Sequence, residues 1–261
     1  MNTISTSTAA TNLTAARPLT GKVALVTGGS RSIGAAIVRK LAADGASVAF
    51  TYVASAEPAH ALVHEIEQAG GTALAIYADA GDASSVQAAV AQTANTFGGL
   101  DILVNSAGIA IVKPAGEFSL EDFDRIVNVN IKGIFVATQE ALKHMGSGGR
   151  IVNIGSINSE YVPYGGGGLY VMTKAAVAGW TQALARDLGP RGITINNVMP
   201  GPTNTDMNPD NSDFAAQAKT YIALQRYAQP HEIADAVAYL ASPGASFITG
   251  ANVPVDGGYS A

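Results

Sequence analysis

Residues 23–34 read Val-Ala-Leu-Val-Thr-Gly-Gly-Ser-Arg-Ser-Ile-Gly, an apolar run that passes directly into a glycine-rich turn. The run predicts a buried strand, and the residues after the turn resume with the apolar spacing of a helix. Glycines at such a junction permit a tight turn and let the backbone come close to a phosphate group. A purely structural turn has the same composition. The position of this one, after the first strand, favours a nucleotide site.

The same alternation continues along the chain. Further apolar, β-branched runs occur at residues 47–52, 73–77, 102–105, 151–154, 193–198 and 252–255, and amphipathic stretches at 33–44, 58–69, 84–97, 120–144 and 170–188 lie between them. Buried strands separated by helices indicate right-handed β-α-β units and a parallel sheet covered on both faces. We therefore predict one α/β domain over residues 19–261, with a Rossmann-type, doubly wound sheet of about seven strands.

Composition excludes several classes of protein. The chain has 261 residues, of which 48% are hydrophobic and 13% charged, so it can bury a large core and is not a disordered protein. A formal net charge of -5 argues against nucleic acid as a partner, and no apolar run reaches the length of a membrane span. The absence of cysteine excludes disulfides and thiolate chemistry. We interpret His60 and His64 as a solvated helix face and expect no metal site.

Residues 1–18 differ in composition from the rest. They are rich in Ser, Thr and Ala and lack the basic start and apolar centre of a secretory signal. We expect a flexible tail in a cytoplasmic protein.

Residues with chemical potential follow several of the predicted strands. They occur at 28–34, Asp79, 105–108, Ser156 and 200–205. Ligands of such sheets bind beyond the carboxyl ends of the strands, so these loops are expected to meet around one site.

Tyr170 and Lys174 are four residues apart and fall on one face of the predicted helix. A phenol normally keeps its proton to about pH 10. A neighbouring cation lowers that pKa, and a shift of about three units would take roughly 4 kcal/mol. Such a tyrosine becomes a general acid or base. The same spacing also occurs in helices where a half-buried ring lies beside an extended amine, so the pair needs support from the loops around it.

These motifs together resemble the short-chain dehydrogenase/reductase family from about residue 19 onward, most closely 3-oxoacyl-acyl-carrier-protein reductases and related carbonyl reductases. The family's Thr-Gly-x-x-x-Gly-x-Gly signature matches residues 27–34, with Ser32 in place of the middle glycine. Residues 105–108, Asn-Ser-Ala-Gly, resemble its Asn-Asn-Ala-Gly element. The family's catalytic tetrad aligns with Asn130, Ser156, Tyr170 and Lys174.

The resemblance implies hydride exchange between a nicotinamide and a carbonyl or secondary alcohol. Tyr170 would transfer the proton, and Lys174 would lower its pKa and hold the nicotinamide ribose. Ser156 would hydrogen-bond the substrate oxygen, and Asn130 would anchor a water chain.

We expect the cofactor to be NADP(H) rather than NAD(H). NAD enzymes usually place a carboxylate at the end of the second strand, whereas residues 50–55 contain none, and Arg31 is placed to bind a 2′-phosphate. Ser32 would be strained at a positive φ, but we expect binding to be retained. The predicted cofactor residues are Gly28, Ser30, Arg31, Ser32, Ile33, Gly34, Tyr52, Ser55, Asp79, Ala80, Asn105, Ala107, Gly108, Tyr170, Lys174, Pro200, Gly201, Thr203 and Thr205.

The substrate is less well specified. The preferred prediction is an enzyme that reduces a small ketone or a 3-oxo ester. The alternatives are a 3-oxoacyl-acyl-carrier-protein reductase, an NAD-dependent secondary alcohol dehydrogenase and, without enzymatic activity, a redox-sensing dinucleotide-binding module. Basic residues such as Arg150 and Arg191 would have to lie near the cleft for an acidic carrier protein to dock. Residues 161–168 and a lid around 202–225 are expected to border the substrate. The family resemblance also implies a homotetramer. Apolar residues such as Ile134, Phe135 and Val177 would serve its paired faces, and core packing would explain them equally well.

Overall fold

The computed structural model describes residues 17–54 and 56–261, so Ser55 and most of the predicted tail lie outside the described part. Seven parallel strands form one sheet in the order β3-β2-β1-β4-β5-β6-β7. Their bounds are β1 Val23–Thr27, β2 Ser47–Tyr52, β3 Thr72–Tyr77, β4 Ile102–Asn105, β5 Arg150–Ile154, β6 Thr194–Pro200 and β7 Asn252–Val255. The predicted doubly wound parallel sheet is confirmed.

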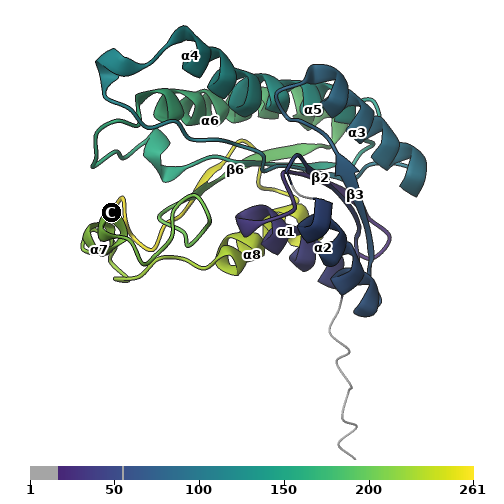
Figure 1. Cartoon of the computed structure of the whole chain (residues 1–261). Helices are drawn as coiled ribbons and strands as arrows, with labels where there is room; N and C mark the ends of the chain where they lie inside the picture. Colours follow the sequence, from purple (N-terminus) through teal and green to yellow (C-terminus); the bar gives the residue numbers. More distant parts are fainter. Residues whose placement is uncertain (1–16, 55) are drawn as a thin grey trace, which may run out of the picture.

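Helices cover both faces of the sheet (Figure 1). One layer contains α3 Ala83–Phe97, α4 Leu120–Val127, α5 Gly133–Ala141 and α6 Gly168–Leu188; the other contains α1 Ser32–Ala43, α2 Ala56–Gln68 and α8 Pro230–Ala241. Each layer encloses its own cluster of buried aliphatic side chains against the sheet. No helix within the described residues is long and apolar enough to cross a membrane.

The central strand β1 marks the point where the strand order reverses. It pairs with β2 on one side and β4 on the other, and all its residues are buried. The loops after β1 and β4 leave the sheet in opposite directions, which opens a crevice at its carboxyl edge.

Two helical regions differ from the prediction. The expected helix over 120–144 ends at Ala141 and is interrupted by a π-turn over Asn128–Lys132, which separates α4 from α5. Helix α8, which the sequence interpretation did not single out, begins at Pro230 with a capping box between Gln229 and Glu232.

The segment after β6 is partly helical. It forms a loop and then the short helix α7, Asp213–Lys219, which lies beside the C-terminus in Figure 1. A small apolar cluster, containing Ala215, Ala218, Tyr227 and Tyr259 among others, joins α7 to the C-terminal segment.

Candidate active site

A cleft of about 1850 Å³ lies at the carboxyl edge of the sheet. Most of the residues predicted for the site line it: Gly28, Ser30, Arg31, Ser32, Ile33, Gly34, Tyr52, Asp79, Ala80, Ala107, Gly108, Ser156, Tyr170, Lys174, Pro200, Gly201, Thr203 and Thr205. Asn105 and Asn130 are buried behind the lining. The structure therefore brings the loops after β1, β3, β4, β5 and β6 to one place.

The glycine loop is held close to the loop after β4. Gly28 has φ 67°, and a Cβ there would lie 2.9 Å from the Cα of Ala107. A Cβ on Gly34 would clash with the carbonyl oxygen of Gly28. The Thr27 hydroxyl accepts hydrogen bonds from the main-chain nitrogens of Ser106 and Ala107. The backbone turn is therefore closely packed. The first turn of α1 contains no acidic residue, so no negative side chain there would repel a pyrophosphate at the start of the helix.

Ser32 adopts the strained conformation that its position predicted, with φ 48°. Its Oγ accepts a hydrogen bond from the main-chain nitrogen of Asp206 at 3.2 Å, and the neighbouring Arg31 lies 3.7 Å from the Asp206 carboxylate. These contacts join the glycine loop to the segment after β6. Because Ser32 accepts in this bond, its hydroxyl proton stays available to a ligand.

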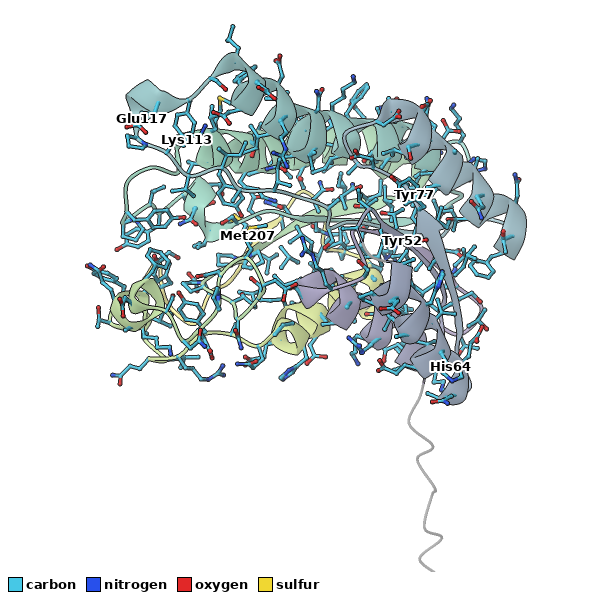
Figure 2. The ribbon with its side chains drawn as sticks, viewed as in Figure 1. Tyr52, His64, Tyr77, Lys113, Glu117 and Met207 are labelled. Atoms are coloured by element: carbon cyan, nitrogen blue, oxygen red, sulfur yellow. The ribbon has the colours of Figure 1, made fainter. Side chains whose placement is uncertain are left out.

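The far end of the cleft is aromatic rather than acidic. Tyr52 ends β2, and its ring lies edge-on to Tyr77 at 5.9 Å and to His60 at 6.3 Å between centroids. Figure 2 shows Tyr52 and Tyr77 together at this end of the molecule. The Asp79 carboxylate forms a hydrogen bond within its own loop, where it accepts from the main-chain nitrogen of Gly81 at 2.8 Å. No carboxylate terminates β2 where an NAD enzyme would place one.

Tyr170 and Lys174 lie one turn apart on α6, which begins at Gly168. The Lys174 Nζ donates to the main-chain oxygen of Ile154 at 2.7 Å and lies 5.6 Å from the centroid of the Tyr170 ring. Lys174 is only 5% exposed. Burial lowers its pKa to about 8.

The pKa of Tyr170 differs in direction from the sequence-based expectation. Burial raises it to about 12, a hydrogen bond with Ser156 offsets part of the rise, and the nearby phenol of Tyr164 adds to it. The neighbouring amine of Lys174 does not offset the effect of burial on the pKa of Tyr170. Tyr170 is therefore protonated at neutral pH, the state that a proton donor to a carbonyl oxygen must have.

Ser156 ends the turn after β5 and starts a short 3₁₀ turn. Its Oγ accepts from the main-chain nitrogen of Asn158 at 3.1 Å and lies 3.4 Å from the Asn158 Oδ1. The same Oδ1 accepts from the Tyr164 hydroxyl at 2.8 Å. Asn158 had no signal in the sequence, because its role depends on the fold of the loop that follows.

Asn130 occupies the π-turn between α4 and α5 and is fully buried. Its amide accepts from the main-chain nitrogen of Ile109 and donates to the Ile109 oxygen, each at 2.9 Å, and also donates to Thr173 at 3.0 Å. A Cβ on Gly108 would lie 3.5 Å from both the Asn130 Oδ1 and the Lys174 Nζ. Asn130 thus holds the loop after β4 against α6, next to the lysine, and π-turns are frequent at functional sites.

Asn105 belongs to a row of asparagines inside the sheet. It is in register with Asn153, Asn197 and Asn252 on the next three strands. Its amide nitrogen donates to Asn153 at 2.8 Å and to Thr138 at 3.3 Å. Its amide nitrogen is bonded in this way, whereas its buried Oδ1 has no hydrogen-bond partner among the described residues. The structure therefore gives Asn105 a supporting position behind the cleft, and direct contact with a cofactor stays a prediction.

The substrate end of the cleft is lined mainly by large apolar and aromatic side chains. The described residues there are Val112, Tyr164, Met207, Phe214 and Tyr259. The Tyr164 ring lies edge-on to Phe214 of α7 at 5.5 Å between centroids. In Figure 2, Met207 lies toward this end, away from Tyr52 and Tyr77. Sequence reasoning named the two loops but not Phe214 and Tyr259 as lining residues.

Comparison with known proteins gives the same family by three routes. A model of the family described as enoyl-(acyl carrier protein) reductase matches residues 28–260. A short-chain dehydrogenase/reductase from Serratia marcescens is 55% identical, with a TM-score of 0.92 over 94% of this chain and 100% of that chain. A short chain dehydrogenase from Burkholderia cenocepacia, solved in complex with NADP, is 50% identical, with a TM-score of 0.92 and the same coverage.

A curated relative has a different description. The cyclic-di-GMP-binding biofilm dispersal mediator protein of Escherichia coli is 45% identical over 242 residues, which are 93% of this chain and 98% of that protein. High identity over nearly full length is thus shared by proteins described as dehydrogenases and by one described through a ligand. With the matched family model, the parallel sheet and the site geometry, these likenesses show that the chain belongs to the short-chain dehydrogenase/reductase family.

Proposed function

We propose that this protein is an NADPH-dependent reductase of small ketones or 3-oxo esters. The observation that carries the proposal is the placement of Tyr170 and Lys174 on one face of α6, beside Ser156, within the cleft that the glycine loop also lines. A proton donor, a hydrogen-bond donor and a cation at one edge of a nucleotide cleft are the groups that carbonyl reduction needs.

Each residue has one task in the proposed reaction. When bound, NADPH supplies the hydride. The Tyr170 hydroxyl donates its proton to the carbonyl oxygen, and the Ser156 hydroxyl fixes that oxygen by a hydrogen bond. The Lys174 ammonium stabilises the negative charge left on the Tyr170 oxygen. Asn130 holds the main chain of residue 109 and thereby the wall of the cleft beside the lysine.

NADP(H) is preferred because of two features at the open end of the cleft. The end of β2 lacks a carboxylate, and the Arg31 side chain is 73% exposed there; among the described residues its ion-pair partner is Asp206. Replacing Asp206 by a 2′-phosphate as the partner of Arg31 would cost little free energy, because an exposed ion pair contributes little. The Burkholderia structure with NADP supports the same choice for a similar protein.

The charges around the cleft favour a neutral substrate. The acidic side chains that line it are Asp79, Asp82, Glu121, Asp124 and Asp206, and the basic ones are Arg31, Arg125 and Lys174. Arg150 donates to the main-chain oxygen of Gly148 and Arg191 to that of Leu142; both oxygens lie between α5 and β5, at the edge of the sheet opposite to the cleft. The two arginines leave the cleft without the basic rim that an acidic carrier protein needs, so a small apolar ketone or ester is favoured.

A redox-sensing or nucleotide-binding module is the main non-enzymatic alternative. Such a module needs the glycine loop but has no use for a buried lysine beside a protonated tyrosine. The desolvation of Lys174 is costly, and groups of this kind cluster at catalytic sites. The pair therefore favours an enzyme.

A substrate panel tests the proposal. Aromatic and aliphatic ketones, 3-oxo esters and 3-oxoacyl thioesters are offered with NADPH and with NADH, and alcohols with NADP. We expect ketones or 3-oxo esters to be reduced faster with NADPH. Equal kcat/KM with the two cofactors would overturn the NADP(H) assignment, and turnover confined to carrier-protein thioesters would overturn the substrate class.

A homotetramer remains the proposed assembly. Phe135 is 50% exposed and Met172 41% exposed on the α4–α6 layer, and Phe247 before β7 is fully exposed. Ile134 and Val177, considered for these faces from sequence, are buried within the subunit instead. Sedimentation of a tetramer would support the proposal, and a monomer would contradict it.

A further inference from the structure

Tyr164 is one of four tyrosines that line the cleft, and the reaction described so far does not use it. It lies in the loop between β5 and α6 and donates its hydroxyl proton to Oδ1 of Asn158 at 2.8 Å. Asn158 follows Ser156 by two residues and contacts it through both its main chain and its side chain. A line of hydrogen bonds therefore connects Tyr164 to the serine that faces the substrate.

Ser156 has only one proton to donate. Its Oγ already accepts from the main-chain nitrogen of Asn158 at 3.1 Å, and the Asn158 Oδ1, at 3.4 Å, is an acceptor within reach of its proton. A proton directed to Asn158 is not available to a substrate carbonyl. The contact from Tyr164 is shorter than that from Ser156, so Tyr164 is the better-placed donor to this oxygen.

We propose that Tyr164 is a positioning residue: its phenol proton satisfies Oδ1 of Asn158, so that Ser156 keeps its own proton for the substrate oxygen. The inference rests on the proposed carbonyl reduction, in which Ser156 contacts the substrate. The Asn158 amide nitrogen donates to the main-chain oxygen of Tyr161 at 3.0 Å. A rotation of the side chain that moved Oδ1 away from Ser156 would break this hydrogen bond.

Two further features hold Tyr164 in its role. Burial raises the pKa of its phenol, which keeps the proton in place at neutral and mildly alkaline pH. The ring of Phe214 from α7 lies edge-on to the Tyr164 ring at 5.5 Å between centroids. Phe214 therefore holds the Tyr164 ring in place, and Tyr164 in turn acts on Ser156 through Asn158.

A double-mutant cycle tests the proposal in the full-length protein. The wild type, Tyr164→Phe, Asn158→Ala and the double variant are compared for reduction of the best ketone of the panel with NADPH. Tyr164→Phe should lower kcat about tenfold, the effect of one misdirected hydrogen bond, with the NADPH dissociation constant and the melting temperature unchanged. In the Asn158→Ala background, which removes the competing oxygen, the same substitution should change kcat less than twofold.

Tyr161→Phe is the matched control, since this phenol lies in the same loop and packs on Tyr259 without a hydroxyl hydrogen bond to any described residue. Asn158→Leu, which also removes the side-chain oxygen and keeps the main-chain donor but fills more of the space, replaces Asn158→Ala if the latter does not fold. A Tyr164→Phe variant with wild-type kcat, or with the same tenfold loss in both backgrounds, would overturn the inference alone. A wild type that reduces no carbonyl, or a Tyr170→Phe variant that still does, would instead remove the proposed function.

Discussion

The catalytic wall of the cleft and its substrate wall are built in different ways. The catalytic wall, with Asn130, Ser156 and Lys174, consists of side chains that are at most 5% exposed. They are fixed by short hydrogen bonds to β5, α6 and the loop after β4. The substrate wall contains Met207, which is 58% exposed, and Phe214, which is 44% exposed. It is formed by loops and by the short helix α7. In the proposed function, the first wall would specify the reaction, and the second would specify which molecule undergoes it.

A change in the catalytic wall should have the largest effect on turnover. Lys174→Met should lower kcat/KM about a hundredfold or more, because the cation that supports proton transfer is lost. The wild-type kcat/KM for reduction should fall as the pH rises through about 8, where Lys174 loses its charge. The fold should persist, since methionine fills the same space without a buried charge. Steady-state kinetics from pH 6 to 10 and thermal melts check these outcomes; an unchanged kcat/KM in the variant would show that the charge has no role.

A substitution in the glycine loop should have the next largest effect. It should weaken the binding of NADPH rather than slow the chemical step. Gly34→Ala forces a Cβ against the carbonyl oxygen of Gly28, so the turn must shift and NADPH affinity should fall about a hundredfold. Gly116→Ala is a suitable control, because its added Cβ meets no atom within 4 Å and its φ is not positive. Fluorescence titration with NADPH measures both. Equal dissociation constants for Gly34→Ala and the wild type would separate this loop from the cofactor.

The substrate wall should show a moderate effect confined to KM. Phe214→Ala removes apolar area that a ketone would cover, so KM should rise about tenfold for aromatic ketones and less for small aliphatic ones. Tyr239→Ala, which truncates a 55% exposed ring on α8 outside the cleft, should leave both KM values unchanged. The same rise for every substrate, or a loss only in kcat, would mean that Phe214 does not contact the substrate.

The contact between the glycine loop and the segment after β6 should have the smallest effect. Ser32→Gly relieves a positive φ, which costs a serine about 1 kcal/mol, but loses a hydrogen bond to Asp206 of similar worth. The NADPH dissociation constant should therefore change less than tenfold. Calorimetric titration would measure it, and a gain in affinity above tenfold would show that the serine obstructs the cofactor.

The two walls also differ in how far the sequence predicts them. The strands, the glycine loop and the spacing of Tyr170 and Lys174 are local patterns, and parallel strands place the loops that follow them at one edge of the sheet. The contact of Ser32 with Asp206 joins residues 174 positions apart, and no local pattern encodes it. The same holds for the contact of Tyr164 with Phe214, which depends on the packing of α7 against the loop after β5. The raised pKa of Tyr170 was missed because burial, rather than the neighbouring charge, has the larger effect.

The central claim is that Tyr170 donates the proton in NADPH-dependent carbonyl reduction. NADPH consumption in the presence of the best ketone, measured for the wild type and for Tyr170→Phe at neutral pH, tests it most directly. The variant retains the ring, so it should bind NADPH as the wild type does while turnover falls about a thousandfold or more. Substantial turnover by Tyr170→Phe at wild-type NADPH affinity would contradict the account.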